Sequence, residues 1–247
     1  MTNRQLAWTL LFSLLTGIPL YGADNELTQR EREAGWLLLF DGKTQHGWKA
    51  VEGSTGELSD SKRPVEDGTI NPRGCGGYML IYEQPFEDFI LKLDLRLGPG
   101  HGSINSGIFI RTYPLQPRAG YDVGFNGIEI AVDSADDTSY VDAGAIYDLA
   151  RPLVNNIYKP VGEGTSKWNH VIVTSHENLI TVVMNDQLLT VCDLDKFVLP
   201  GKRPDGSDHK FVIAMKDHPR KGYIGLQDHG GECNYKNIKL LPLSKNP

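Results

Sequence analysis

The sequence predicts an all-β protein folded as an antiparallel β-sandwich or jelly roll. Short runs of β-forming residues recur along the chain, and Gly, Pro, Asn and Asp separate them. Several of these runs alternate apolar and polar residues with period two. A convincing helical pattern occurs only over residues 24–34, so the crossover helices that parallel strands need are missing. About a dozen strands without interposed helices favour two packed antiparallel sheets.

The expected elements follow one another in chain order. A short helical lead-in over residues 24–34 precedes a single β-domain over residues 35–243, which no repeat or low-complexity linker divides. The predicted strands are Trp36–Phe40, Trp48–Val51, Gly77–Tyr82, Phe89–Leu97, Ser106–Tyr113, Gly127–Val132, Ala143–Tyr147, Trp168–Ser175, Leu179–Met184, Gln187–Cys192, Gly222–Gln227 and Cys233–Leu241. Long loops are expected over residues 52–66, 148–167 and 198–220, and such loops on a rigid sandwich commonly carry the ligand.

Two of these patterns are especially clear. The run Phe89–Leu97 places four leucines on one face and charged residues on the other, as expected for a half-buried strand. The runs Leu179–Met184 and Gln187–Cys192 flank Asn185 and Asp186, two residues that tolerate left-handed backbone. This arrangement predicts a β-hairpin with a two-residue turn.

The N-terminus has a different character from the rest of the chain. Arg4 gives a positive start, residues 6–15 form an apolar run, and residues 16–23 end it with small residues. This pattern predicts a secretory signal peptide over residues 1–23 and an exported mature protein, periplasmic or extracellular. The apolar run is short for a transmembrane span, and a retained N-terminal anchor is the alternative.

Composition and cysteine spacing exclude several classes of partner. The chain has a formal net charge of −6 and no basic run, which argues against nucleic acid and anionic membrane surfaces as partners. Cys75, Cys192 and Cys233 are widely spaced, so at most one disulfide can form and a structural role is expected. No spacing typical of a metal site occurs, and no cofactor is expected.

Residues 221–230, Lys-Gly-Tyr-Ile-Gly-Leu-Gln-Asp-His-Gly, carry the strongest local signal for chemistry. A short strand leads into Gln227, Asp228 and His229 and stops at Gly230. A strand that delivers a carboxylate and an imidazole to its end can hold acid–base groups at the rim of a sheet. The alternative is ordinary turn chemistry, in which Asp228 bonds its own backbone.

Several sequence blocks together are characteristic of one family. They are Gly35–Thr44 with Gly47-Trp48, Asn105–Arg111, Glu129-Ile130 with Asp133, Gly144–Tyr147, Lys159-Pro160, Trp168-Asn169, Gly222–Gly230 and Asn237-Ile238. On these blocks, which run in order through residues 35–241, the chain resembles the 3-keto-disaccharide hydrolase domain family. The resemblance implies a concanavalin A-like jelly-roll sandwich that cleaves glycosides already oxidised to a ketone at C3.

The chain departs from the family pattern at three places. Ala131 stands where the family has a glutamine, residues 162–169 form a longer turn, and residues 198–220 read as an insertion. Each departure can change the shape of a substrate pocket, so the identity of the sugar and of the linkage stays open.

Three residues are the candidates for catalysis. His229 is expected to carry a proton, because imidazole is partly charged near neutral pH. Glu129 lies between two isoleucines, so a partly buried carboxyl with a raised pKa is expected. Arg111 ends an apolar run, and its guanidinium can bind a ketone oxygen or a sugar hydroxyl; a strand-end ion pair with Glu129 or Asp133 is the alternative.

A second set of residues is expected to contact the sugar. It consists of Asp228, Gln227, Tyr147, Lys159, Asp133 and Ser106. For Tyr147 a packed core position is the alternative, and for Lys159 a solvated loop position. Asp133 alternatively only ends its strand in a turn.

The carboxylate spacing argues against an ordinary glycosidase. Glu129 and Asp133 lie on one strand with Cα atoms roughly 13 Å apart, whereas glycosidases need carboxyl groups about 5.5 Å or about 6.5–9.5 Å apart. A 3-keto sugar instead has an acidic C2 proton, and its cleavage by elimination needs one base, one cation for the enolate and one proton donor.

Two other outcomes stay open at this point. A divalent metal could replace Arg111 as the enolate stabiliser, although no ligand spacing demands one. The rival class of protein is a non-catalytic carbohydrate-binding, lectin-like sandwich module, and a structural domain without a ligand is a third option. Convergence of Arg111, Glu129 and His229 in one pocket is the feature that would favour the enzyme.

Overall fold

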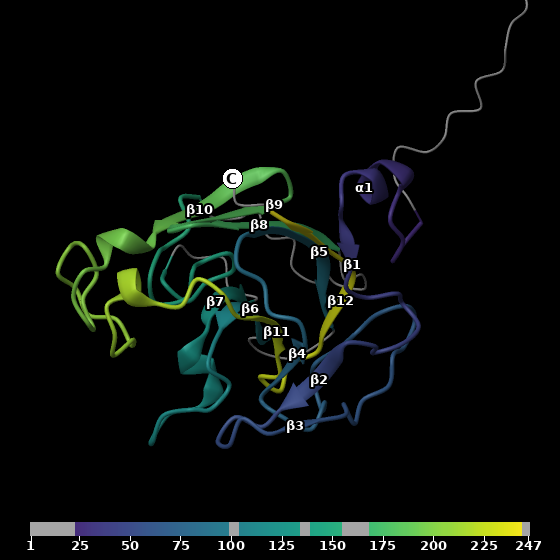
Figure 1. Ribbon diagram of the computed structural model, residues 1–247, viewed down its shortest axis with the longest axis horizontal. Helices are drawn as coiled ribbons and strands as arrows, with labels where there is room; N and C mark the ends of the chain where they lie inside the picture. The colour runs from purple at the N-terminus through teal and green to yellow at the C-terminus, as the bar shows by residue number, and fades with distance from the viewer. Residues whose placement is uncertain (1–22, 99–103, 134–138, 155–167, 244–247) are drawn as a thin grey trace, which may run out of the picture.

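Two six-stranded antiparallel sheets face one another across an apolar core (Figure 1). The computed structural model describes residues 23–98, 104–133, 139–154 and 168–243. The strand order is β1-β12-β5-β8-β9-β10 in one sheet and β3-β2-β4-β11-β6-β7 in the other. The predicted all-β antiparallel sandwich is therefore confirmed. Residues 1–22 of the predicted signal peptide lie outside the described residues.

Helices in the described part of the chain are short. The α-helix α1 spans Gln29–Glu33, and its N-cap Thr28 forms a capping box with Glu31. The 3₁₀ helices are η1 (Val123–Asn126), η2 (Leu194–Lys196) and η3 (Met215–Asp217). Within the described residues, none of these helices has the length and apolarity that a membrane crossing requires.

The strands follow the predicted ones closely. They are β1 (Leu37–Leu38), β2 (Trp48–Val51), β3 (Leu58–Ser59), β4 (Met79–Tyr82), β5 (Phe89–Leu97), β6 (Asn105–Thr112), β7 (Ile128–Asp133), β8 (Asn169–His176), β9 (Leu179–Met184), β10 (Gln187–Asp193), β11 (Tyr223–Gln227) and β12 (Cys233–Pro242). In β5 the four alternate leucines are buried in the core, as the pattern predicts. Asn185 (φ 48°) and Asp186 (φ 66°) form the predicted turn between β9 and β10.

One predicted strand, Ala143–Tyr147, is wrong. This segment is a turn-rich loop against β7, tied to it by backbone hydrogen bonds from Gly144 to Ala131 O and from Tyr147 to Glu129 O. Gly144 has a φ of 82° and Asp148 a φ of 60°, and neither value continues an extended strand. The very short β3 and the 3₁₀ helices were not predicted from the sequence.

The second sheet has two different faces. Its inner face contributes Ile108, Ile110 and Ile130 to the main core. On its outer face Phe109 packs in a second, smaller apolar cluster that includes Met79. Glu129 is the register partner of Phe109 and therefore shares this outer face.

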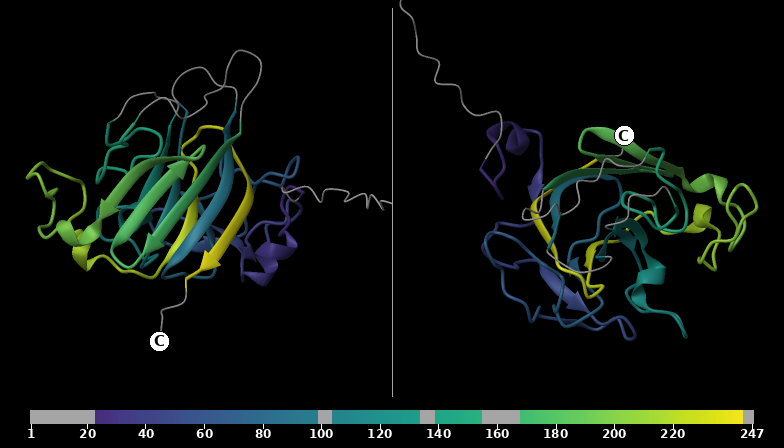
Figure 2. Two further views of the ribbon diagram at one scale, coloured as in Figure 1. Left: turned by 90° about the horizontal axis from the view of Figure 1, so that it is seen from above. Right: turned by 180° about the vertical axis from the view of Figure 1, so that it is seen from behind.

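Residues 198–220, which read as an insertion, extend from the edge of the sandwich (the yellow-green segment in Figure 2). They follow β10 and η2, and they lead into β11. β10 ends one sheet and β7 ends the other, so this segment emerges at the edge near β7. The three thiols, Cys75, Cys192 and Cys233, are all free and buried, in agreement with a structural role.

Candidate active site

Glu129 is a buried carboxylic acid on the outer face of the second sheet. It lies in β7, and only 5% of its surface is exposed. Gly107 on the neighbouring strand β6 makes room for it, because a Cβ atom at position 107 would lie 2.6 Å from Glu129 Oε1. Steric fit therefore explains why the Asn105–Arg111 block has glycine at position 107.

Lys210 is the cation closest to this carboxyl among the ion pairs that the described residues form. Its Nζ lies 3.9 Å from Glu129 Oε2. The same ammonium lies 4.3 Å from the ring centre of Tyr147, 5.0 Å from that of Phe125 and 5.3 Å from that of Phe211. Three aromatic rings and one carboxyl therefore surround Lys210, which favours a charged ammonium by cation–π attraction.

The two groups shift each other's proton affinity. Burial raises the pKa of Glu129 to about 7; Lys210 opposes this shift and Asp122 adds to it. Burial lowers the pKa of Lys210, while Glu129, Asp148 and Asp122 oppose that shift. A carboxyl that is partly protonated near neutral pH can both accept and return a proton, which is the property of a general acid–base catalyst.

Tyr78 and Gln227 extend the polar group on the same face. Gln227 Nε2 donates to the Tyr78 hydroxyl at 3.0 Å. Burial raises the pKa of Tyr78, and the nearby charges of Asp122 and Glu129 add to the shift. Gln227 Oε1 is buried without a hydrogen-bond partner among the described residues, a condition that is uncommon for a buried polar atom. We call Glu129, Lys210, Tyr147, Tyr78 and Gln227 the Glu129 cluster.

Arg111 does not belong to this cluster. It is fully buried with a φ of 53°, where a bulge places Ile110 and Arg111 opposite the single residue Ile224. Its Nη2 lies 3.2 Å from an Oδ1 of Asp88, the residue that precedes β5 of the opposite sheet. The guanidinium therefore pairs with Asp88, and among the described residues no hydrogen bond or ion pair joins Arg111 to Glu129, so its predicted part in catalysis stays a prediction.

Asp228 and His229 lie in the turn between β11 and β12. Asp228 accepts hydrogen bonds from the backbone of Gly230 at 2.9 Å and of Gly74 at 2.8 Å, which is the turn chemistry left open above. His229 is exposed. Among the described residues no hydrogen bond or ion pair joins His229 to Glu129, so its predicted part in catalysis stays a prediction.

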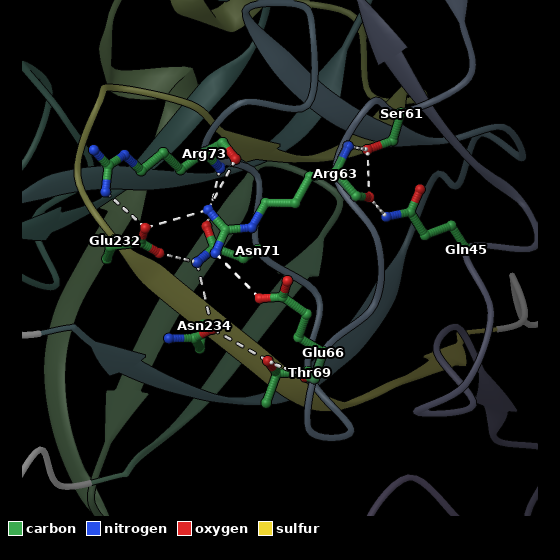
Figure 3. A network of polar contacts seen from close by, with 9 residues as sticks. All are labelled: Gln45, Ser61, Arg63, Glu66, Thr69, Asn71, Arg73, Glu232 and Asn234. Atoms are coloured by element: carbon green, nitrogen blue, oxygen red, sulfur yellow. Dashed lines mark hydrogen bonds and ion pairs between the residues drawn. The ribbon is translucent and has the colours of Figure 1, made fainter.

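A polar network holds this turn in place (Figure 3). Glu232, which follows the turn, accepts hydrogen bonds from Arg63, Arg73 and Asn71 on a preceding loop. Asn71 also contacts Asn234 of β12. The network fixes the loop that includes Gly74 against the turn that carries His229.

The remaining predicted contact residues have different places. Ser106 is buried on the core side, where it donates to the backbone oxygen of Gln227 at 2.8 Å and lies 2.9 Å from the Tyr235 hydroxyl. Its predicted substrate contact stays a prediction. Asp133 is buried at the end of β7 opposite Asn105. Lys159 lies outside the described residues.

Lys210 is the functional candidate that the sequence did not indicate. It lies within residues 198–220, where an insertion was inferred and no motif marks it. Tyr78 was likewise read only as part of a strand. Glu129, Tyr147 and Gln227 were predicted, and the structure brings these three together.

Comparisons with known proteins agree with this fold and identify the family of the chain. Residues 35–241 match the family model of the 3-keto-alpha-glucoside-1,2-lyase-like domain, and the chain belongs to this family. A 3-keto-disaccharide hydrolase of Bacteroides thetaiotaomicron is 26% identical over 240 residues, which cover 85% of this chain and 79% of that protein.

Solved structures give the fold alone. A proposed glycosyl hydrolase from Parabacteroides distasonis superposes with a TM-score of 0.66 at 24% identity, covering 84% of this chain and 99% of that one. A galectin-like protein of unknown function from Bacillus subtilis superposes with a TM-score of 0.50 at 11% identity, covering 81% and 91%. Both likenesses agree with the sandwich described above.

Proposed function

We propose that this protein cleaves the glycosidic bond of 3-keto-glycosides by elimination followed by hydration. The observation that carries the proposal is the buried Glu129 carboxyl, with a pKa of about 7, beside the Lys210 ammonium at 3.9 Å. Membership of the 3-keto-alpha-glucoside-1,2-lyase-like family supports the substrate class. The relative named 3-keto-disaccharide hydrolase supports it as well.

Glu129 is the base in this reaction. Its carboxylate removes the C2 proton, which the C3 ketone makes acidic, and the electron pair moves onto the ketone oxygen as an enolate. Lys210 donates a hydrogen bond to that oxygen and offsets the developing negative charge. Lys210 thus takes the part that the sequence had suggested for Arg111.

The enolate then expels the C1 substituent. The ketone re-forms, a double bond forms between C1 and C2, and the C1–O bond breaks as the leaving oxygen takes a proton. The donor is protonated Glu129 or, at the rim, His229. Water next adds at C1 and a proton returns to C2, which releases the 3-keto sugar. Tyr147 and Gln227 hold the sugar hydroxyls.

These groups act without a cofactor in the proposed reaction. Loss of activity on dialysis against a metal chelator, with recovery on adding a divalent ion, would contradict this part of the proposal. The competing function is a non-catalytic, lectin-like sandwich. A buried carboxyl poised to titrate near neutral pH favours catalysis, because sugar binding alone does not need it.

The test is cleavage of a 3-keto-glucoside in D₂O by the full chain. We expect cleavage of the keto-glycoside, no cleavage of the unoxidised glycoside, and deuterium at C2 of the released sugar. Glu129→Gln should lower kcat by about 10²-fold or more. Product without deuterium at C2, or equal cleavage of the plain glycoside, excludes elimination. Binding of keto-sugars without turnover would favour the lectin-like module.

A further inference from the structure

Residues 198–220 contribute Lys210 to the Glu129 cluster, and a second, buried ion pair joins this segment to the sandwich beside the cluster. Arg203 Nη2 pairs with Asp148 Oδ1, and Arg203 Nε donates to the Asp148 backbone oxygen at 3.0 Å. The Arg203 side chain is only 8% exposed. This buried, two-point contact joins distant segments and differs from exposed pairs such as Lys202–Asp208.

Arg203 also organises its own segment. Its Nη1 donates to the Ser207 hydroxyl at 3.3 Å and to the backbone oxygen of Asp208. Its guanidinium lies 3.8 Å from the ring centre of Tyr140, which belongs to the same loop as Asp148. The Arg203 side chain thus closes the turn over residues 203–208 and attaches it to the loop that contains Tyr140 and Asp148.

Asp148 connects Arg203 to two residues of the Glu129 cluster, Lys210 and Tyr147. Its Oδ2 accepts a hydrogen bond from the backbone N–H of Lys210 at 2.5 Å. It directly follows Tyr147, whose N–H donates to the backbone oxygen of Glu129 at 2.8 Å. Asp148 is therefore hydrogen-bonded to the backbone of Lys210 and adjoins Tyr147, which is hydrogen-bonded to the backbone of Glu129.

We propose that the Asp148–Arg203 pair is a latch that positions Lys210 against Glu129. The inference rests on the proposed roles of Glu129 and Lys210. Asp148 and Arg203 are positioning residues, since neither forms a hydrogen bond or ion pair with Glu129 in the described part of the chain. They act on Glu129 only through the position that they give Lys210.

The charged groups around Glu129 make this proposal measurable. Lys210 and Asp122 are the charges that act on the Glu129 carboxyl, while Tyr78 and Tyr147 face it as neutral phenols. Arg203 and Asp148 are not among the charges that shift it. If the latch opens, Lys210 moves away and the pKa of Glu129 rises further.

The experiment compares Arg203→Leu, Arg203→Lys and a control, Lys202→Met. Lys202 forms an exposed pair with Asp208 on the same segment, so its loss leaves the latch intact. Glutamate labelled with ¹³C at the carboxyl is followed by NMR against pH, with Glu129→Gln assigning the signal. We expect Arg203→Leu to raise the titration midpoint of Glu129 by roughly one pH unit. Arg203→Lys should give a midpoint between those of the parent and Arg203→Leu, and Lys202→Met should give the parent's midpoint.

A double variant separates positioning from general destabilisation. With Lys210→Met in place, Arg203→Leu should cause no further change in the Glu129 midpoint, because the path through Lys210 is already absent. If Arg203→Leu does not fold, Asp148→Asn keeps the shape and removes the charge, and its midpoint should rise as well. An unchanged midpoint in a folded latch variant, or an equal rise in the Lys210→Met background, overturns the latch.

Turnover distinguishes this inference from the proposed function. In latch variants kcat should fall about tenfold with little change in KM, and the acid limb of the pH profile should move upward with the NMR midpoint. If the midpoints behave as expected but even the parent protein cleaves no 3-keto-glycoside, the latch stands and the proposed function fails. If the parent turns over and Arg203→Leu keeps the parent's midpoint, the latch fails and the proposed function stands.

Discussion

The Glu129 carboxyl has a cost in stability that follows from its burial. Its pKa rises from the ordinary value of 4.5 to about 7 in the folded protein. Between these two pH values the folded protein holds a proton that the unfolded chain has released, so stability falls as the pH rises through this window. The full effect is about 3 kcal/mol above pH 7. Such a cost is expected where a site needs a reactive group.

Glu129→Gln should therefore stabilise the protein while removing its activity. Gln has nearly the same shape and does not ionise. We expect a gain of about 1–3 kcal/mol in unfolding free energy at pH 8 and almost none at pH 4.5. The loss of the ion pair with Lys210 reduces the gain at pH 8. Denaturant unfolding at both pH values measures this. Glu57→Gln, at an exposed carboxyl, is the control and should change neither value. A Gln variant that is less stable at pH 8 would contradict the raised pKa.

Single residues were predictable where their neighbours in sequence decide their environment. Glu129 stands between Ile128 and Ile130, and its burial and raised pKa are confirmed. Arg111 was not predictable, because the bulge that turns it toward Asp88 depends on the register with β11. Lys210 was missed for a related reason, since only its tertiary contacts distinguish it from a solvated loop lysine.

At the scale of elements, hydrogen bonds to the charged Glu232 side chain help to hold the turn between β11 and β12 in position. Burial alone would raise the pKa of Glu232, but hydrogen bonds from Arg63, Arg73 and Asn71 outweigh it and lower that pKa. The resulting stabilisation is present above the unfolded carboxyl's pKa and is lost as the pH falls through the folded one. The loop of Figure 3 should therefore loosen in acid before the sheets unfold.

Glu232→Gln tests this role of the network. We expect a loss of about 1–2 kcal/mol in unfolding free energy at pH 7, because charge-assisted hydrogen bonds become neutral ones. The loss should vanish well below pH 4, where the parent carboxyl is also neutral. Asp60→Asn is the comparison, since its pair with Lys49 is exposed to solvent and should contribute much less to stability. Equal effects of the two substitutions would show that the network does not hold the turn.

Elements were predictable where period-two alternation was strong, as in β5, and where a turn signal joined two β-forming runs, as in β9 and β10. The segment 143–147 was misread because its apolar residues look like a strand, whereas Gly144 and Asp148 bend it into a loop. That error matters for the site, because the bend is what brings Tyr147 to Glu129 and Asp148 to the latch. Residues 198–220 have no such periodicity, and tertiary contacts place them, among them the Arg203–Asp148 pair and the burial of Phe211 and Met215 in the core.

At the scale of the whole molecule, tertiary contacts begin almost at the first described residue. Asp24 pairs with Lys236 of β12 at 2.5 Å. The backbone N–H of Asn25 donates to the Asn237 side chain at 2.6 Å, and that of Asn237 donates to the Asn25 side chain at 2.8 Å. A chain that starts at residue 23 or 24 keeps all these contacts.

We predict that the N-terminal segment directs export and is removed by cleavage after Gly22 or Ala23, leaving a mature N-terminus at residue 23 or 24. Arg4 and the apolar run 6–15 have the form of a signal peptide. N-terminal sequencing of the protein recovered outside the cytoplasm checks the cleavage site. Leu11→Arg interrupts the apolar run and should leave the uncleaved precursor inside the cell, whereas Thr2→Ser should be processed as the parent is. A native protein that begins at Met1 or Thr2 would contradict cleavage. An exported but uncleaved chain would instead support the N-terminal anchor.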